Sequence, residues 1–78
     1  MKSVNIKLKE IAEAQSFAGT LGKYTVDLDL KSGRYIVDAR SLIGIFAFNW
    51  KQPVELMIHS DDESVVNAIL ADVKEWTV

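Results

Sequence analysis

The sequence has no cysteine, one proline and one histidine among its 78 residues. Without cysteine it can form no disulfide bond and no thiolate metal site, which suits a reducing compartment. No apolar run approaches the roughly 20 residues of a membrane-spanning helix. The first residues, Met-Lys-Ser-Val, alternate in polarity at once and lack the apolar core of a signal peptide. We therefore expect a soluble, cytoplasmic protein that does not contact a membrane.

An excess of charge of one sign is also absent. Lysine and arginine number 9, aspartate and glutamate number 11, and the formal net charge is −2. Such a chain lacks the basic surface that binds a phosphate backbone, so nucleic acid is not the expected partner. Apolar residues make up 49% and charged residues 26% of the sequence, as in a globular protein. We expect residues 1–78 to form one domain.

Four segments alternate apolar and polar residues, which is the pattern of a half-buried β-strand. They are residues 4–8, 26–30, 35–39 and 54–58. Ser32-Gly33 lies between the second and third segments, and this turn signal predicts a hairpin. The residues predicted to face a layer of helices are Val4, Ile6, Leu8, Val26, Leu28, Val37, Leu56 and Ile58.

Three other segments have the spacing of amphipathic helices. They are predicted from residue 10 to 22, from 41 to about 48, and after an N-cap at Ser60 or Asp61. The predicted buried positions are Ile11, Ala14, Phe17, Ala18 and Leu21 in the first helix, and Val65 or Val66, Ile69, Leu70, Val73 and Trp76 in the third. The order β-α-β-β-α-β-α favours an α+β fold with helices on one face of an antiparallel sheet. By itself this order leaves open a ferredoxin-like arrangement of the first six elements.

Few groups in the sequence are suited to catalysis. The sole histidine, His59, ends the fourth predicted strand, and its phase in the alternation predicts a solvent-exposed structural position on the polar face of the sheet. The sequence contains no glycine-rich phosphate-binding loop and no nucleophile elbow. We therefore expect a protein that is not an enzyme and that holds no cofactor.

Three aspartates, Asp27, Asp29 and Asp38, are predicted to lie near one another on the polar face of the sheet. Like charges on neighbouring strands are usually solvated or paired with cations, and Lys31 and Arg34 are the nearest candidates. With no cysteine and one histidine available, we expect no metal site here.

The most specific pattern is Arg40-Ser41-Leu42-Ile43-Gly44-Ile45-Phe46, in which Ser41 is suited to cap a short helix after a strand. The stretch resembles the segment around the regulatory serine of HPr, the histidine-containing phosphocarrier of the bacterial sugar phosphotransferase system. That family has a basic residue followed by Ser-Ile-Met-Gly-Val-Met in the same context. The resemblance runs without gaps from Tyr24 to Trp76. It implies an HPr-like open-faced β-sandwich, whose four-stranded antiparallel sheet has the order 1-4-2-3 and three helices on one face.

The most diagnostic motif of the family, Gly-Leu-His-Ala-Arg-Pro-Ala, carries the phosphorylated histidine at the start of a helix. At constant spacing it falls on residues 8–14, where Glu10 stands in place of the histidine and Ala12 in place of the arginine. Only the final alanine, Ala14, agrees. The resemblance therefore implies a divergent HPr-like protein without the phosphocarrier centre. Glu10 is also an acid near a predicted helix N-terminus, where the helix dipole favours it.

For the matching serine, Ser41, the resemblance implies regulatory phosphorylation by HPr kinase/phosphorylase. A phosphate there would lie at the N-terminus of the short helix, and Arg40 could supply a charge-assisted hydrogen bond.

The resemblance also implies a docking surface for protein partners, formed by Leu42, Ile43 and Phe46 on the exposed side of the short helix together with Arg40 before it. Ile45 and Phe48 are predicted to face the core on the other side. The alternative is that Phe46 and Trp50 fold back onto the core.

The resemblance and these residues favour a regulatory or adaptor protein of the phosphotransferase system type. Its expected partners are HPr kinase/phosphorylase, a regulator of carbon catabolism or a metabolic enzyme. The chain resembles the catabolite-repression paralogue in lacking the histidine and keeping the serine, but it also lacks the arginine and proline of the motif. Two alternatives remain open: a phosphocarrier that uses an unrecognised residue, and a structural or oligomerising module with Phe46 and Trp50 in a self-interface.

Overall fold

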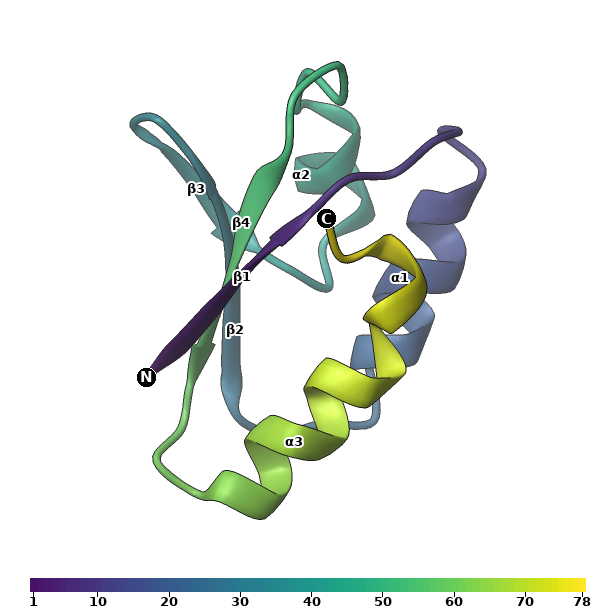
Figure 1. Cartoon of the computed structure of the whole chain (residues 1–78). Helices are drawn as coiled ribbons and strands as arrows, with labels where there is room; N and C mark the ends of the chain where they lie inside the picture. Colours follow the sequence, from purple (N-terminus) through teal and green to yellow (C-terminus); the bar gives the residue numbers. More distant parts are fainter.

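The computed structural model describes residues 1–78, which form four strands, three α-helices and one 3-10 helix. In chain order these elements are β1 (Lys2–Ile6), α1 (Glu13–Leu21), β2 (Asp27–Ser32), β3 (Tyr35–Asp38), α2 (Leu42–Phe46), β4 (Val54–His59), α3 (Glu63–Asp72) and η1 (Lys74–Trp76). The strands form one antiparallel sheet in the order β1-β4-β2-β3. The helices lie on one side of this sheet and leave the other side open (Figure 1). The predicted fold class and strand order are confirmed, and the ferredoxin-like alternative is wrong.

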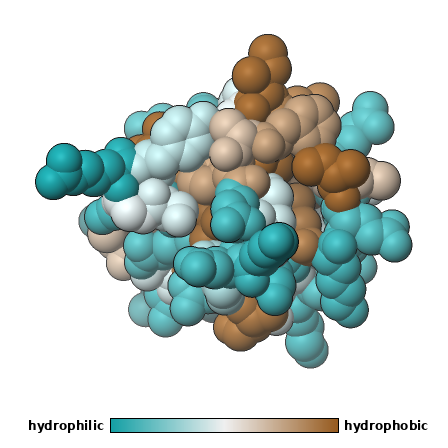
Figure 2. Space-filling view, turned by 90° about the horizontal axis from the view of Figure 1, so that it is seen from above, coloured by the Kyte–Doolittle hydropathy of each residue, from teal (hydrophilic) through white to brown (hydrophobic).

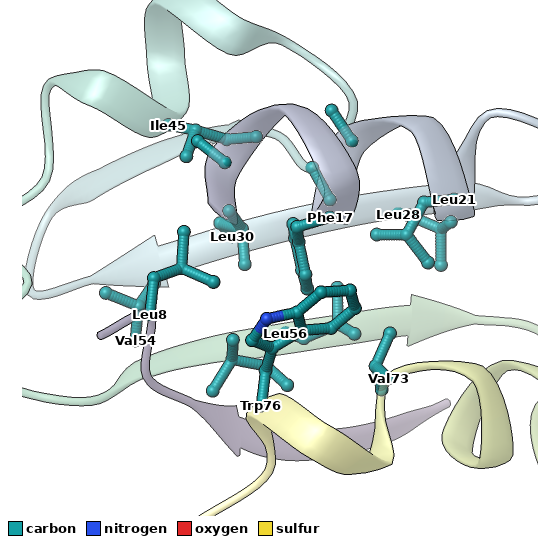
Figure 3. Close-up of a cluster of buried hydrophobic side chains, with 14 of the residues drawn as sticks. Leu8, Phe17, Leu21, Leu28, Leu30, Ile45, Val54, Leu56, Val73 and Trp76 are labelled. Carbon is teal, nitrogen blue, oxygen red and sulfur yellow. The ribbon is translucent and has the colours of Figure 1, made fainter. Parts of the chain in front are cut away.

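The register of the sheet explains why its inner face is apolar. Leu56 of the central strand β4 lies opposite Val4 on one side and Leu30 on the other. Because side chains alternate along a strand, this row and the equivalent rows point together toward the helices. On the side of the helices the cluster they form is covered by Phe17 of α1 and Trp76 of η1, whose rings meet edge to face with centroids 5.3 Å apart (Figure 3).

The inward alternation predicted from the sequence is confirmed. Of the eight strand residues predicted to face the helices, five are buried. The other three, Val4, Val26 and Val37, are half-buried against the same cluster. In the last helix Ile69, Val73 and Trp76 are buried, with Trp76 supplied by the separate 3-10 turn. None of the helices combines the length and the apolar character that crossing a membrane requires.

The first helix begins three residues later than predicted, at Glu13 instead of Glu10. Ile11 lies in the turn before it and is 61% exposed, so its predicted place on the apolar face is wrong. The carboxylate of Glu13 accepts hydrogen bonds from the backbone N–H groups of Lys9 and Glu10. These bonds hold the preceding residues in a turn that the helical spacing of the apolar residues does not reveal.

Further boundaries differ from the prediction, and β1 spans Lys2–Ile6 where a strand was predicted at residues 4–8. The two-residue turn of the hairpin is Gly33-Arg34, one residue later than expected, because Ser32 is still paired with Tyr35. Gly33 has φ 60°, a left-handed conformation that glycine adopts without steric cost. The N-cap of α3 is Asp62, whose carboxylate accepts a hydrogen bond from the backbone N–H of Ser64 at 3.0 Å. The predicted caps were Ser60 and Asp61.

Two of the aspartates on the open face of the sheet have partners of their own. Asp29 Oδ2 lies 2.9 Å from Nε2 of His59. Asp38 Oδ1 accepts hydrogen bonds from the backbone N–H of Arg40 at 2.8 Å and from its Nε at 3.2 Å. No cluster of three or more side chains on this face has the arrangement of a metal site. Lys31 and Arg34, the expected partners, pair with none of the three aspartates, since Asp29 pairs with His59 and Asp38 with Arg40.

Candidate functional site

The loop before α1 and the short helix α2 lie at the same end of the molecule, at the top of Figure 1. A hollow of about 250 Å³ at this end is lined by residues 8–11 on one side and 49–51 on the other. The segment that the resemblance equates with the phosphocarrier centre thus faces the connection that follows α2. We call this end the apical surface and define it by the exposed residues Glu10, Ile11, Ile43 and Phe46.

Glu13 fixes the position of the loop that carries Glu10. Its Oε1 accepts the backbone N–H of Lys9 at 2.7 Å and that of Glu10 at 3.1 Å. Its Oε2 accepts the indole N–H of Trp76 at 3.1 Å, a contact between residues 63 positions apart. The N–H donors of Lys9 and then of Glu10 hold the pKa of the Glu13 carboxyl below its ordinary value of 4.5, because they stabilise the charged form. One carboxylate therefore braces the apical loop against the C-terminal turn.

The lowered pKa of Glu13 predicts an acid-dependent loss of stability. A carboxyl whose pKa is lower in the folded than in the unfolded state stabilises the fold above its unfolded pKa, and that contribution is lost as pH falls through the folded pKa. We expect the free energy of unfolding to decline below about pH 4.5 less steeply in Glu13→Gln than in the wild type. Urea titrations at a series of pH values measure this difference. Parallel curves for the two proteins would contradict the bracing role.

Ser41 is the N-cap of α2, as predicted. Its Oγ accepts a hydrogen bond from the backbone N–H of Gly44 at 3.2 Å, and its backbone is extended, with φ −86° and ψ 109°. Gly44 is buried against Val37 of β3, and a Cβ built on Gly44 would lie 2.8 Å from the Val37 Cβ. The Ser-x-x-Gly pattern therefore has a structural explanation in both residues, since one caps the helix and the other lets it approach the sheet.

Removal of the cap is expected to weaken the fold, while an acid at the same position should preserve it. Ser41→Ala should lower the free energy of unfolding by about 0.5–2 kcal/mol, because the Gly44 N–H loses its acceptor. Ser41→Asp should stay close to the wild type, since aspartate is an equally good cap. Chemical denaturation of the three proteins measures both effects. A Ser41→Ala protein as stable as the wild type would contradict the capping role.

Helix α2 exposes part of its apolar surface. Ile43 is 85% and Phe46 is 50% exposed, while Ile45 on the opposite side is fully buried. Leu42 is half-buried and packs against the core, so its predicted place on the exposed side is wrong. Figure 2 looks down on this end of the molecule and shows apolar groups gathered over part of it, flanked by hydrophilic ones.

Trp50 folds back onto the domain, whereas Phe46 does not. The indole N–H of Trp50 donates to the carbonyl of Ile45 at 2.9 Å, and its ring lies edge to face against Phe48 at 5.8 Å. Phe48 is buried, as predicted, and also contacts the ring of Tyr35. The alternative that both aromatic residues join the core is therefore correct for Trp50 alone. Its indole lines the apical hollow and offers no free polar group there.

The Arg40 side chain is bound within the chain and makes no hydrogen bond to the Ser41 side chain. Its Nη1 donates to the backbone carbonyl of Tyr24 at 2.7 Å, and its Nε donates to Asp38 at 3.2 Å. The guanidinium thereby connects the end of the hairpin to Tyr24 in the segment between α1 and β2.

His59 lies far from the apical surface. Strand β4 runs from the apical end toward the opposite end of the sheet, where His59 is its last residue (Figure 1). His59 is an exposed residue beside Asp29 on the open face, as predicted. The structure therefore brings no imidazole to the loop that contains Glu10.

Two bracing residues were missed by sequence reasoning. Besides Glu13, the hydroxyl of Tyr24 donates to the carboxylate of Asp72, which joins the segment after α1 to the end of α3. Burial, and then this hydrogen bond, raise the pKa of Tyr24 to about 12. An acid three residues after the start of a turn can accept hydrogen bonds from the backbone N–H groups that precede it. This pattern could have identified Glu13. No pattern in the sequence around Tyr24 or Asp72 predicts the contact between them.

The sheet order, the three helices on one face and the serine-capped α2 together define an HPr-like open-faced sandwich. Among solved structures, the chain is similar to HPr-C-His from Thermoanaerobacter tengcongensis, with a TM-score of 0.72, 25% identity, and coverage of 96% of this chain and 93% of that one. It is also similar to the phosphocarrier protein HPr from Bacillus anthracis str. Ames, with a TM-score of 0.66, 24% identity, and coverage of 92% and 93%.

The structural neighbours of this chain are thus HPr phosphocarrier proteins, and the chain has their fold over almost its whole length. No protein-family model matches the sequence, and neither does any curated protein.

Proposed function

We propose that the chain is an HPr-like regulatory or adaptor protein that binds protein partners through its apical surface. The observation that carries this proposal is the exposure of Ile43 (85%), Ile11 (61%) and Phe46 (50%) at one end of a small domain. Large apolar side chains that gather on the surface of a small protein usually mark an interface, and aromatic residues often supply its anchor. Phe46 is the proposed anchor.

The proposal excludes phosphoryl transfer through histidine. Glu10 occupies the position that the resemblance assigns to the phosphorylated histidine, and Ala12 the position of the arginine that would neutralise the phosphoryl group. Phosphorylation of a carboxylate would give an acyl phosphate, and no cationic side chain replaces the missing arginine at position 12. The alternative of a phosphocarrier that uses another residue is tested by the labelling experiment below.

Regulation by phosphorylation of Ser41 is part of the same proposal. Ser41 is partly exposed and lies beside the proposed docking residues. A phosphate there would add up to two negative charges and three acceptor oxygens next to an apolar docking surface, which would change partner choice. Arg40 is not included in the proposed surface, because its guanidinium is already bound by Asp38 and Tyr24.

The partners that fit this proposal are HPr kinase/phosphorylase, a regulator of carbon catabolism and a metabolic enzyme. Isothermal titration of each purified candidate with the wild type and with Phe46→Asp tests the surface directly. Binding that is lost in Phe46→Asp supports the proposal. Binding of equal affinity to both proteins would refute it. Ser41→Asp, which keeps the cap, then reports the effect of charge at that position on partner choice.

Incubation with Enzyme I and phosphoenolpyruvate is expected to leave the chain unlabelled. The physical reason is the absence of an imidazole near Glu10, with His59 at the other end of the sheet. The matched control is the Bacillus anthracis HPr, a phosphocarrier by its name, which should be labelled under the same conditions. Acid-labile phosphate on His59, or an acyl phosphate on Glu10, would show that the chain is a phosphocarrier after all.

A further inference from the structure

The two edges of the sheet differ in whether another segment of the chain pairs with them. At the β1 edge, Thr77 forms a bridge with Ile6, and the backbone N–H of Val78 donates to the carbonyl of Asn5 at 3.0 Å. At the other edge, β3 forms the outer margin of the molecule, and no segment pairs with its outer side (Figure 1). An uncovered edge strand is a template for pairing with another strand.

The hydrogen bonds inside the hairpin show which backbone groups of β3 point outward. The N–H of Ala39 donates to the carbonyl of Leu28 at 2.8 Å, so residue 39 belongs to a hydrogen-bonded pair. Such pairs alternate along an antiparallel ladder, which places residues 37 and 35 in the same class. The N–H and C=O groups of Ile36 therefore point away from β2, toward the free edge. Its side chain is 53% exposed.

The charged residues along this edge are placed so that two copies of the edge have complementary charges. Arg34 and Asp38 flank Ile36 at equal distances, two residues before and two residues after it. When two copies of the strand run antiparallel with Ile36 opposite Ile36, the hairpin-turn residue Arg34 of each copy lies at the same end of the pair as Asp38 of the other copy, within reach of its long side chain. Opposite charges at neighbouring positions across a strand pair stabilise it, while like charges destabilise it.

From this geometry and charge pattern, we propose that a second copy of the chain pairs with β3 along its free edge, centred on Ile36. The two four-stranded sheets then form one continuous sheet with a twofold axis perpendicular to it. Ile36 of each copy both donates to and accepts from Ile36 of the other. A shift of the register by two residues would place Ile36 opposite a charged residue and would remove both ion pairs.

The acidic partner in this contact is available. Asp38 uses Oδ1 for its hydrogen bonds to Arg40, whereas Oδ2 has no partner within the chain. The Asp38 side chain is 54% exposed, and Arg34 is exposed in the hairpin turn. The contact does not rest on the proposed function, because it uses the sheet edge and not the apical residues.

Charge-reversal variants distinguish this arrangement from other modes of self-association. Arg34→Asp alone places aspartate near aspartate, and Asp38→Arg alone places arginine near arginine. Each variant should weaken self-association at least about tenfold, equivalent to about 1.4 kcal/mol. An equimolar mixture of the two should recover it, because every neighbouring pair in the mixed dimer is again of opposite charge. Sedimentation velocity from micromolar to millimolar concentration measures the association, and circular dichroism verifies that both variants fold.

Phe46→Asp is the control variant and should associate like the wild type. The wild type should show slowed exchange of the Ile36 amide proton at high concentration, and its association should weaken with added salt. A chain that remains monomeric at millimolar concentration, with a freely exchanging Ile36 amide, would overturn the proposal and leave the edge for an extended segment of another protein. A dimer that forms equally well in both charge variants would overturn it too.

Discussion

Replacement of Phe46 by alanine is expected to weaken the binding of a partner protein by about 1–3 kcal/mol, as the loss of an interface anchor does. The free energy of unfolding should change much less. Half of the Phe46 surface is already in contact with solvent, and its ring does not pack against any of the other aromatic rings. Isothermal titration gives the first quantity, and urea denaturation of the same protein gives the second.

The matched control for this variant lies two positions further along the chain. Phe48 is only 8% exposed, and its ring contacts those of Tyr35 and Trp50. Phe48→Ala should therefore cost about 3–5 kcal/mol of folding free energy, the range for truncating a buried phenylalanine. If Phe46→Ala unfolds the domain to the same degree and no partner loses affinity, Phe46 is a core residue and the apical surface is not a docking site.

Gly44→Ala should destabilise the fold by about 1–3 kcal/mol, the usual cost of overpacking a close contact. The added Cβ would lie 2.8 Å from Cβ and 2.9 Å from Cγ2 of Val37, and a β-branched side chain on a strand cannot swing away from it. Because rotation about χ1 leaves the valine Cβ in place, a change of rotamer cannot relieve the 2.8 Å contact, and α2 must move off β3. Displacement of α2 would also move Ile43 and Phe46, so partner binding should fall together with stability.

Gly19→Ala is the opposite case and provides the control. Gly19 lies within α1, and a Cβ built there meets no atom within 4 Å. Alanine should therefore stabilise the helix by about 0.5–1 kcal/mol through its better helix propensity. The same chemical change should thus have opposite signs at two glycines, and chemical denaturation of both variants measures it. A neutral or stabilising Gly44→Ala would show that α2 tolerates a greater distance from the sheet.

Alternation with period two was sufficient to predict all four strands and the direction of their side chains. Rows such as Val4, Leu56 and Leu30 carry this information locally, in the polarity of each strand. The order of the strands is a different matter, since polarity does not specify which strands are neighbours. It came from the resemblance around Ser41, and the structure and its HPr neighbours confirm it.

The boundaries that were missed depend on competition between neighbouring polar groups. Three residues in succession, from Ser60 to Asp62, can cap a helix, and only the backbone conformation selects Asp62. Ile11 has the correct spacing for the apolar face of α1, but the side chain of Glu13 stabilises a turn at that point. Both outcomes rest on hydrogen bonds between side chains and the nearby backbone, which the pattern of apolar residues does not contain.

The sequence predicted those features of the candidate site that depend on contacts between residues close in sequence. It missed those that depend on contacts between separate elements. The capping role of Ser41 follows from a contact three residues away, and it is confirmed. The binding of Arg40 to the carbonyl of Tyr24 and the half-burial of Leu42 depend on how separate elements meet in space. The exposure of Ile43 and Phe46, which the resemblance implied, is confirmed.

The brace at Glu13 has a consequence for the order of events during synthesis. The loop that carries Glu10 is held by Trp76, and the same turn is tied down by a backbone hydrogen bond from Lys7 to the Trp76 carbonyl at 2.9 Å. These contacts cannot form until residues 76–78 have left the ribosome. The loop beside α2 is therefore fixed only after η1 has been made, and contacts of such long sequence separation slow folding. A nascent chain that lacks η1 would present α2 before the loop beside it is fixed, so a partner that contacts both elements should bind such a chain more weakly.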